Sequence, residues 1–398
     1  MAAEPIAPLP VPAPDRIPAQ LGMLLAAVIS FGFAHSTYFL LPKYLELELH
    51  ADPSEIGRYM SATWFTNVAF VSFAGLWIDR GGRRPFAYVG AVALVATCLG
   101  FLAVDRLGPL LLCLRIAHGI AFTMFFVATQ TLAADLAPPA RLGQVLGYYG
   151  SGFVVTNAAA PAVAEWLAAR AGWSAVFGAT AVLALVPLVL LAFVREERAP
   201  RHADAEPAPS IGATLARPGF PRVLGVSALA GITFAAAFTY NQPFALSLGI
   251  GRVSDFFVAY SLTAMLVRGP FGALADSWGR LRVTGFSLAV YTAAAFAMTQ
   301  LSALGLVVTG CAFGVAHGLF YPALNAYALE NAGPDERAKV TALFNGAFNV
   351  GFSSGSLALG YVAREAGYAP LFALAGVCSL AALAVLPRTR ASEAPGRE

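Results

Sequence analysis

Apolar residues occur along this chain in long stretches rather than in short alternations or narrow stripes. A helix needs about 20 predominantly apolar residues to cross a bilayer. Twelve stretches reach that length, at approximately 20–42, 56–78, 84–104, 109–134, 142–169, 172–194, 221–248, 254–275, 282–301, 303–330, 338–363 and 368–387. Because backbone groups in lipid must be paired within their own segment, each stretch is predicted to be a helix. The pattern therefore predicts an all-α integral membrane protein with twelve transmembrane helices.

The longest hydrophilic interruption, rich in proline, glutamate and arginine, divides these helices into two sets of six. Such a composition is typical of a loose linker. The predicted organisation is a disordered tail, an N-terminal six-helix bundle, a linker, a C-terminal six-helix bundle and a second tail, at 1–19, 20–194, 195–220, 221–387 and 388–398.

Composition agrees with the pattern and adds an orientation. The chain is 58% hydrophobic and 12% charged, whereas soluble proteins are nearer a quarter charged. Of its 25 lysines and arginines, 17 fall in the segments that share a side with the termini and 6 in the segments on the other side. The positive-inside bias predicts that both termini, and with them the linker and tails, are cytoplasmic. Arginine far outnumbers lysine and alanine is abundant. This composition fits a GC-rich bacterium and so favours a location in a bacterial inner membrane.

Several classes of chemistry find no support in the sequence. The four cysteines lie in apolar stretches without paired spacing, so we predict neither a disulfide nor a metal site. Three histidines lie at membrane depth, but no thiol or carboxylate accompanies them at ligand spacing. No nucleotide-binding loop or nucleophile–base motif is visible, so no enzyme, cofactor or nucleic-acid partner is predicted. The expected partners are a small-molecule substrate, protons and the lipid bilayer, with the chain acting as a monomer.

The two halves repeat one plan. Four short segments of the first half recur in the second at nearly constant offset: 75–83 as 272–280, 117–119 as 316–318, 138–141 as 334–337, and 171–173 as 366–368. A duplicated six-helix unit explains all four. Parallel repeats of this kind are a transporter architecture, in which the substrate site lies between the halves near the midplane.

The first loop copy resembles the signature Gly-x-x-x-Asp-Arg-x-Gly-Arg-Arg of the major facilitator superfamily, at Gly75, Asp79, Arg80, Gly82, Arg83 and Arg84. The resemblance implies the major facilitator fold, with twelve helices in two pseudo-symmetric bundles that work by alternating access. It also implies that Asp79 faces the amino-terminal end of a helix in the other bundle, where the helix dipole favours a carboxylate.

This loop is expected to form a cytoplasmic gate with its repeat in the second half. We expect Arg83 to pair with Asp135, and Arg280 with Glu330. A row of residues four apart, Arg268 and Gly272 to Asp276, gives the eighth helix a charged end of the same kind. The alternative is a basic loop that only sets topology. The predicted gate residues are Gly75, Asp79, Arg80, Arg83, Asp135, Arg268, Asp276, Arg280 and Glu330.

Arg115 interrupts the apolar stretch of the fourth helix, where an ionised side chain is costly and marks a functional site by default. His118 lies one turn away on the same face. The segment resembles the Arg-x-x-Gln-Gly motif of proton-coupled exporters, with His118 in place of glutamine. We predict a proton-coupling or anion-binding group of Arg115, His118, His35 and Glu165, with Glu165 as the ion-pair partner of Arg115. The alternatives are a purely structural Arg115, and a Glu165 that reaches toward Arg170.

Polar residues in the middle of helices one, four, seven, ten and eleven are predicted to line the substrate path: Thr37, Tyr38, Gln130, Tyr240, Asn241, Gln242, His317, Tyr321, Asn325, Asn345 and Asn349. Phenylalanines surround them. Aromatic walls with a few convergent polar groups suit an amphiphilic organic compound. The alternative is ordinary interhelical packing by small polar residues.

Three functions follow from this sequence. The first is secondary active transport of a small organic compound, driven outward by proton entry. The second is proton-coupled import of a sugar or organic anion, with Arg115 binding the anion directly. The third is a non-transporting sensor, assembly partner or lipid scramblase on the same fold.

Overall fold

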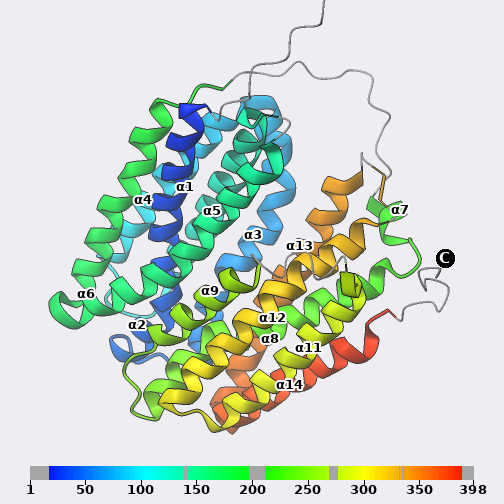
Figure 1. The fold of residues 1–398 in the computed structure, drawn as a ribbon. Coiled ribbons are helices and arrows are strands. Elements are labelled where there is room, and N and C mark those ends of the chain that lie inside the picture. Colours follow the sequence, from blue (N-terminus) through cyan, green and yellow to red (C-terminus); the bar gives the residue numbers. More distant parts are fainter. Residues whose placement is uncertain are drawn as a thin grey trace, which may run out of the picture.

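The structure, a computed structural model, describes residues 18–138, 141–196, 211–268, 277–330, 332–333 and 336–387. Figure 1 shows that these segments are helical throughout, joined by short turns. The first half contains α1 (Ala19–Thr37), the 3-10 turn η1 (Tyr38–Leu40), α2 (Leu41–Leu47), α3 (Pro53–Gly81), α4 (Arg83–Phe101), α5 (Pro109–Leu136) and α6 (Leu142–Ala192). The second contains α7 (Ile211–Leu215), α8 (Phe220–Ser247), α9 (Ser254–Arg268), α11 (Arg280–Ala297), η3 (Met298–Gln300), α12 (Ala303–Leu329), α13 (Arg337–Ala366) and α14 (Tyr368–Val385).

Helix lies at every one of the twelve predicted spans, and eight segments of the described residues are long and apolar enough to cross a membrane by length and composition alone. One of these, α6, contains two predicted spans. Its helix breaks at Gly172, which has φ 78° and ψ 172°. Gly367, between α13 and α14, has nearly the same conformation. A side chain is strongly disfavoured at such angles, so glycine ends one span and starts the next at the matching place in both halves.

The helices form two groups, and each group has its own apolar core. One core consists of residues from α1 to α6, and the other is built mainly from α8 to α14. In Figure 1 the two groups spread apart toward the end where α6 stops and α7 begins. We call this the linker end. The opposite end is the one at which α3, α5 and α9 begin.

Helices differ in how deeply they are buried within the protein. In the most apolar window, 67% of the span Ala19–Leu47 and 72% of α8 is buried, against 39% of α4 and 33% of α14. The first long helix of each half is therefore central, while α4 and α14 are more peripheral. Across the halves, α3 packs on α13 and α6 packs on α9.

Close helix contacts depend on small residues, as is usual in membranes. On α13, a side chain at Gly351 would overlap the backbone carbonyl of Ala228 in α8, whereas Gly346, on the same helix, faces open space.

We expect Gly351→Ala to destabilise the protein by about 1–3 kcal/mol through overpacking. The matched variant Gly346→Ala should leave stability unchanged or slightly higher. Thermal unfolding in detergent checks both, and equal melting temperatures for the two variants would contradict this account of the packing.

Candidate functional site

Arg115 is buried inside the first half, with only 2% of its surface exposed. Its Nε donates a hydrogen bond to the backbone carbonyl of Tyr59, in α3, at 3.1 Å. One terminal nitrogen lies 3.4 Å from Nδ1 of His118, and the other lies 3.8 Å from the sulfur of Met60. Within the described part of the chain, no carboxylate contacts the guanidinium. Its charge is therefore stabilised by neutral groups.

His118 also bonds to His35, and the contact with Arg115 sets the direction of that bond. The two rings are buried, and Nε2 of His118 lies 2.9 Å from Nδ1 of His35. A guanidinium only donates, so Nδ1 of His118 must accept, and its proton must then lie on Nε2. His118 is therefore neutral and donates to His35 in this arrangement. We call Arg115, His118 and His35 the relay.

Aromatic rings enclose the relay. Phe122 stacks on the ring of His35 at 4.2 Å, and the edge of Tyr38 meets the ring of His118 at 4.7 Å. Three of the predicted coupling residues are thus brought together by α1 and α5, and Tyr38, predicted for the substrate path, joins them.

Glu165, the fourth predicted residue, lies elsewhere, and its predicted pairing with Arg115 is wrong. Its carboxylate accepts from Nζ of Lys43 at 2.5 Å, from the backbone N–H groups of Val253 and Ser254 at 3.0 Å, and from the Ser254 hydroxyl at 2.5 Å. Because Val253 and Ser254 open α9, the carboxylate caps that helix from the other half. The alternative partner, Arg170, stacks on Trp166 instead.

Further polar contacts close the opposite end. Lys43 also donates to the carbonyl of Gly251, and the Gln242 amide donates to the carbonyl of Phe39 at 2.7 Å. Together with Glu165, these groups join the end of the first helix to the second half. We call Lys43, Glu165 and Ser254 the clasp. Lys43 is not among the site residues that the sequence predicts.

A second link at this end joins α3 to α13. Asp52 caps α3, and its carboxylate lies 4.0 Å from the guanidinium of Arg364. Burial raises the pKa of Asp52, but hydrogen bonds from Ser54 and Glu55 and the charge of Arg364 outweigh it and hold the pKa below its ordinary value. The cap and the link therefore persist as the pH falls toward that lowered pKa.

Among the described residues, the ion pairs at the linker end lie within one half. The predicted pairs are present: Arg83 with Asp135 at 3.1 Å, and Arg280 with Glu330 at 3.0 Å. Glu196, which sequence reasoning missed, caps α4 by accepting from the N–H groups of Arg83 and Arg84. The predicted gate residue Asp276 lies outside the described residues, as do the side chains of Asp79 and Arg80 and the surroundings of Gly75. The guanidinium Nε of Arg268 is buried.

The residues predicted for the substrate path lie in different surroundings. In the second half, His317 bonds to the hydroxyl of Tyr291 at 2.8 Å and stacks on Phe234, and Tyr321 bonds to Asn345. Gln130 is exposed, and Asn325 has a buried carbonyl oxygen. Four more are held in the packing by bonds to backbone carbonyls: Thr37, Tyr240, Asn241 and Gln242. Asn349 donates to the side-chain oxygen of Asn67 at 3.1 Å.

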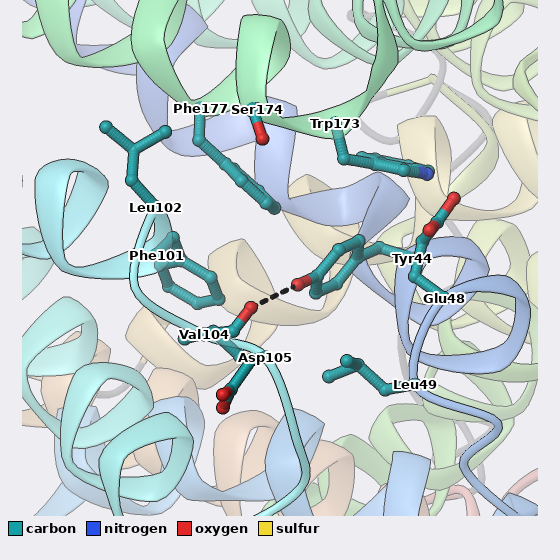
Figure 2. Close-up of a pocket in the computed structure, with 10 residues that line it drawn as sticks. All are labelled: Tyr44, Glu48, Leu49, Phe101, Leu102, Val104, Asp105, Trp173, Ser174 and Phe177. Atoms are coloured by element: carbon teal, nitrogen blue, oxygen red, sulfur yellow. Dashed lines mark hydrogen bonds between the residues drawn. The ribbon is translucent and has the colours of Figure 1, made fainter.

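Figure 2 shows a pocket of about 270 Å³ at the opposite end of the first half. Rings of Tyr44, Phe101, Trp173 and Phe177 form its walls, and the Tyr44 hydroxyl donates to the carbonyl of Val104 at 3.1 Å. Phe101 lies 4.8 Å from Tyr38, ring to ring. One layer of aromatic rings therefore separates this pocket from the relay.

Known proteins share this architecture. The chain is 28% identical over 372 residues to an uncharacterized 38 kDa protein of Thermoproteus tenax, with 85% of this chain and 88% of that protein covered. It is 24% identical over 160 residues to the multidrug resistance protein MdtL of Escherichia coli O157:H7, with 40% of each covered.

Two solved structures have a similar fold. The nucleoside transporter NupG superposes with a TM-score of 0.74, covering 93% of this chain and 99% of that one. The human organic anion transporter MFSD10 (TETRAN) superposes with a TM-score of 0.68, covering 93% of this chain and 100% of that one. Both are 15% identical to this chain, so they bear on the fold alone.

The family assignment rests on the whole chain. A sequence model of the Major Facilitator Superfamily matches residues 23–255 and again residues 223–398, so the two overlapping matches cover nearly the whole chain. Together with the apolar helices, this match identifies a multi-pass membrane protein and a transporter rather than an enzyme. The chain belongs to the Major Facilitator Superfamily.

Proposed function

We propose that this protein exports a small, amphiphilic organic compound in exchange for protons. The observation that carries the proposal is the relay: a buried arginine, unpaired with any described carboxylate, hydrogen-bonded to two buried histidines in series. Histidine is the side chain whose ordinary pKa lies in the physiological range. Similarity to MdtL, a multidrug resistance protein, supports export.

Proton arrival would rearrange the relay in a defined way. A doubly protonated His35 donates from Nδ1, so Nε2 of His118 must then accept. The proton of a neutral His118 moves to Nδ1, which faces the guanidinium of Arg115. Two donors then face each other, and Arg115 loses its acceptor. Protonation thus frees Arg115 for another partner, and this release is the coupling step that we propose.

The structure suits one state of an alternating-access cycle. The described hydrogen bonds and ion pairs between the halves lie at the opposite end and at mid-depth, whereas the predicted gate pairs of the linker end lie within one half. We place the linker end and both termini in the cytoplasm of a bacterial cell and the protein in its inner membrane, from the distribution of basic residues. In that orientation, the conformation is closed to the outside.

Import of an organic anion is the second candidate. It is favoured by the buried charge of Arg115, because a carboxylate or phosphate group of the substrate would pair with the guanidinium. The relative directions of proton and solute flux separate the two.

Replacement of Arg115 tests the proposal. Hydrogen bonds to charged groups contribute about 1.5–3 kcal/mol, so Arg115→Ala should lower the rate of proton-coupled transport roughly 10- to 100-fold. The measurement uses proteoliposomes that contain a pH-sensitive dye and face a panel of amphiphilic compounds, sugars and organic acids. Arg170→Ala, in the same half but stacked on Trp166, is the matched control and should transport normally. Unchanged proton flux in Arg115→Ala would refute the role of the relay.

The imidazole of His35 is expected to set the pH dependence, because His35 is the group that takes up the proton in the proposed step. His35→Gln keeps one acceptor and one donor but cannot take up a proton. Transport by the natural protein should vary across about pH 5 to 8, and the variant should give a flatter profile. A variant profile as steep as that of the natural protein would assign the titration to another group.

The clasp is expected to hold the opposite end closed. Glu165→Ala removes the carboxylate that accepts from Lys43 and from the first N–H groups of α9, so the closed state should lose population several-fold. Spin labels at the exposed Arg106 and Leu304, one in each half, report the separation of this end. Asp255→Ala serves as control, because Asp255 pairs only with the neighbouring Arg252 among the described contacts. The same distance distribution in all three proteins would show that the clasp does not hold the end closed.

A further inference from the structure

Helix α3 is joined to the relay helix by interlocking contacts. The hydroxyl of Thr63 donates to the backbone carbonyl of Arg115 at 3.0 Å, while the guanidinium of Arg115 donates to the carbonyl of Tyr59. The helices approach so closely at Gly119 that a side chain there would overlap the carbonyl of Thr63. A displacement of Arg115 therefore acts directly on α3.

The other side of α3 meets the second half. Gly57 leaves no room for a side chain beside the carbonyl of Ser356, in α13. Further along the same pair of helices, the rings of Trp64 and Phe352 lie 5.2 Å apart. Helix α3 thus contacts α5, which carries Arg115 and His118, on one face, and α13 of the second half on another face.

Asn67 bridges both faces. Its Nδ2 donates to the hydroxyl of Thr123 at 2.7 Å, and its Oδ1 accepts from Nδ2 of Asn349, in α13, at 3.1 Å. Thr123 in turn donates to the carbonyl of Gly119, the residue after His118. Asn67 as a whole residue is 8% exposed, so loss of either partner leaves a buried polar group unsatisfied.

We infer that Asn67 is a positioning residue that couples the relay to the separation of the two halves, through its bridge from Thr123 to Asn349. This inference rests on the proposed function. A rearrangement of Arg115 moves α5 against α3, and the doubly bonded amide of Asn67 carries that movement to α13. The bond between Asn67 and Asn349 lies near the middle of α3 and of α13, so polar contacts join the two halves as far as mid-depth in this state.

Among the described residues, few ionisable groups outside the relay face it. One is Tyr38, in η1, whose ring meets the ring of His118. Cys98, in α4, lies behind Tyr38. Helix α3 presents the carbonyl of Tyr59 and the sulfur of Met60. A pH response of the bundle that depends on the relay therefore originates in these groups.

The test measures the two-state equilibrium without substrate. Spin labels at Arg106 and Leu304 are measured by pulsed EPR in lipid nanodiscs, between about pH 5 and 8, in the full-length protein. The variants are Asn67→Ala, Asn349→Ala and the double variant. Ser354→Ala is the matched control, because the Ser354 hydroxyl bonds within α13. Asn349→Ala leaves the bond from Asn67 to Thr123 in place, so it tests the bridge even if Asn67→Ala proves unstable.

We expect the open and closed populations of the natural protein and of Ser354→Ala to change with pH. Each bridge variant should shift the ratio roughly 3- to 20-fold at fixed pH, as for a single polar contact in a membrane. The pH response should shrink, and the double variant should add little, because both changes remove one bond. Full pH responses in both single variants would overturn the inference. A natural protein that does not respond to pH would instead overturn proton coupling itself, together with the inference.

Discussion

The site is organised by one constraint, a guanidinium held inside an apolar helix bundle without a described carboxylate beside it. Such a charge is costly at membrane depth and must be satisfied by the groups that neighbouring helices offer. A backbone carbonyl of α3 takes one donor, and a ring nitrogen of His118 takes another. Because arginine never accepts a hydrogen bond, it fixes the proton position on His118, and His118 fixes the direction of its bond to His35. The protonation state of the site is thus tied to the position of one cation.

The duplicated unit supports this arrangement in only one of its halves. His317 matches His118, but its partner is the hydroxyl of Tyr291, which can donate or accept and so leaves the tautomer free. Gly314 stands where Arg115 stands in the first half. A side chain at Gly314 would begin 2.5 Å from the carbonyl of Tyr260 and 2.9 Å from Thr263, so α9 and α12 are too close there to admit an arginine. The same position of the repeat therefore carries a buried charge in the first half, at Arg115, and a close helix contact in the second half, at Gly314.

The two ends of the bundle are held by different means. At the linker end, the described arginines Arg83 and Arg280 pair with carboxylates of their own half, so these two pairs do not join the halves. At the opposite end, Glu165 accepts from a lysine of its own half and from the start of α9 in the other, so its bonds depend on closure. A carboxylate at a helix amino terminus is favoured by the unpaired N–H groups and the dipole. The closed end is therefore stabilised by groups that would need new partners when it opens.

The sequence by itself determined the helices, the repeat, the proximity of Arg115 to His118 and the pairing of Arg83 with Asp135. Those features depend on the length of apolar stretches, on local spacing within one helix, or on the loop signature of the family. Only the tertiary structure decided that His35 meets His118, that Glu165 binds Lys43 and α9 instead of Arg115, and that Asn67 joins α5 to α13. The physical reason is that these helices are apolar on all sides, so their sequences do not show which face meets which neighbour. Close contacts at distant glycines, such as Gly57, Gly119 and Gly351, set those rotations and with them the site.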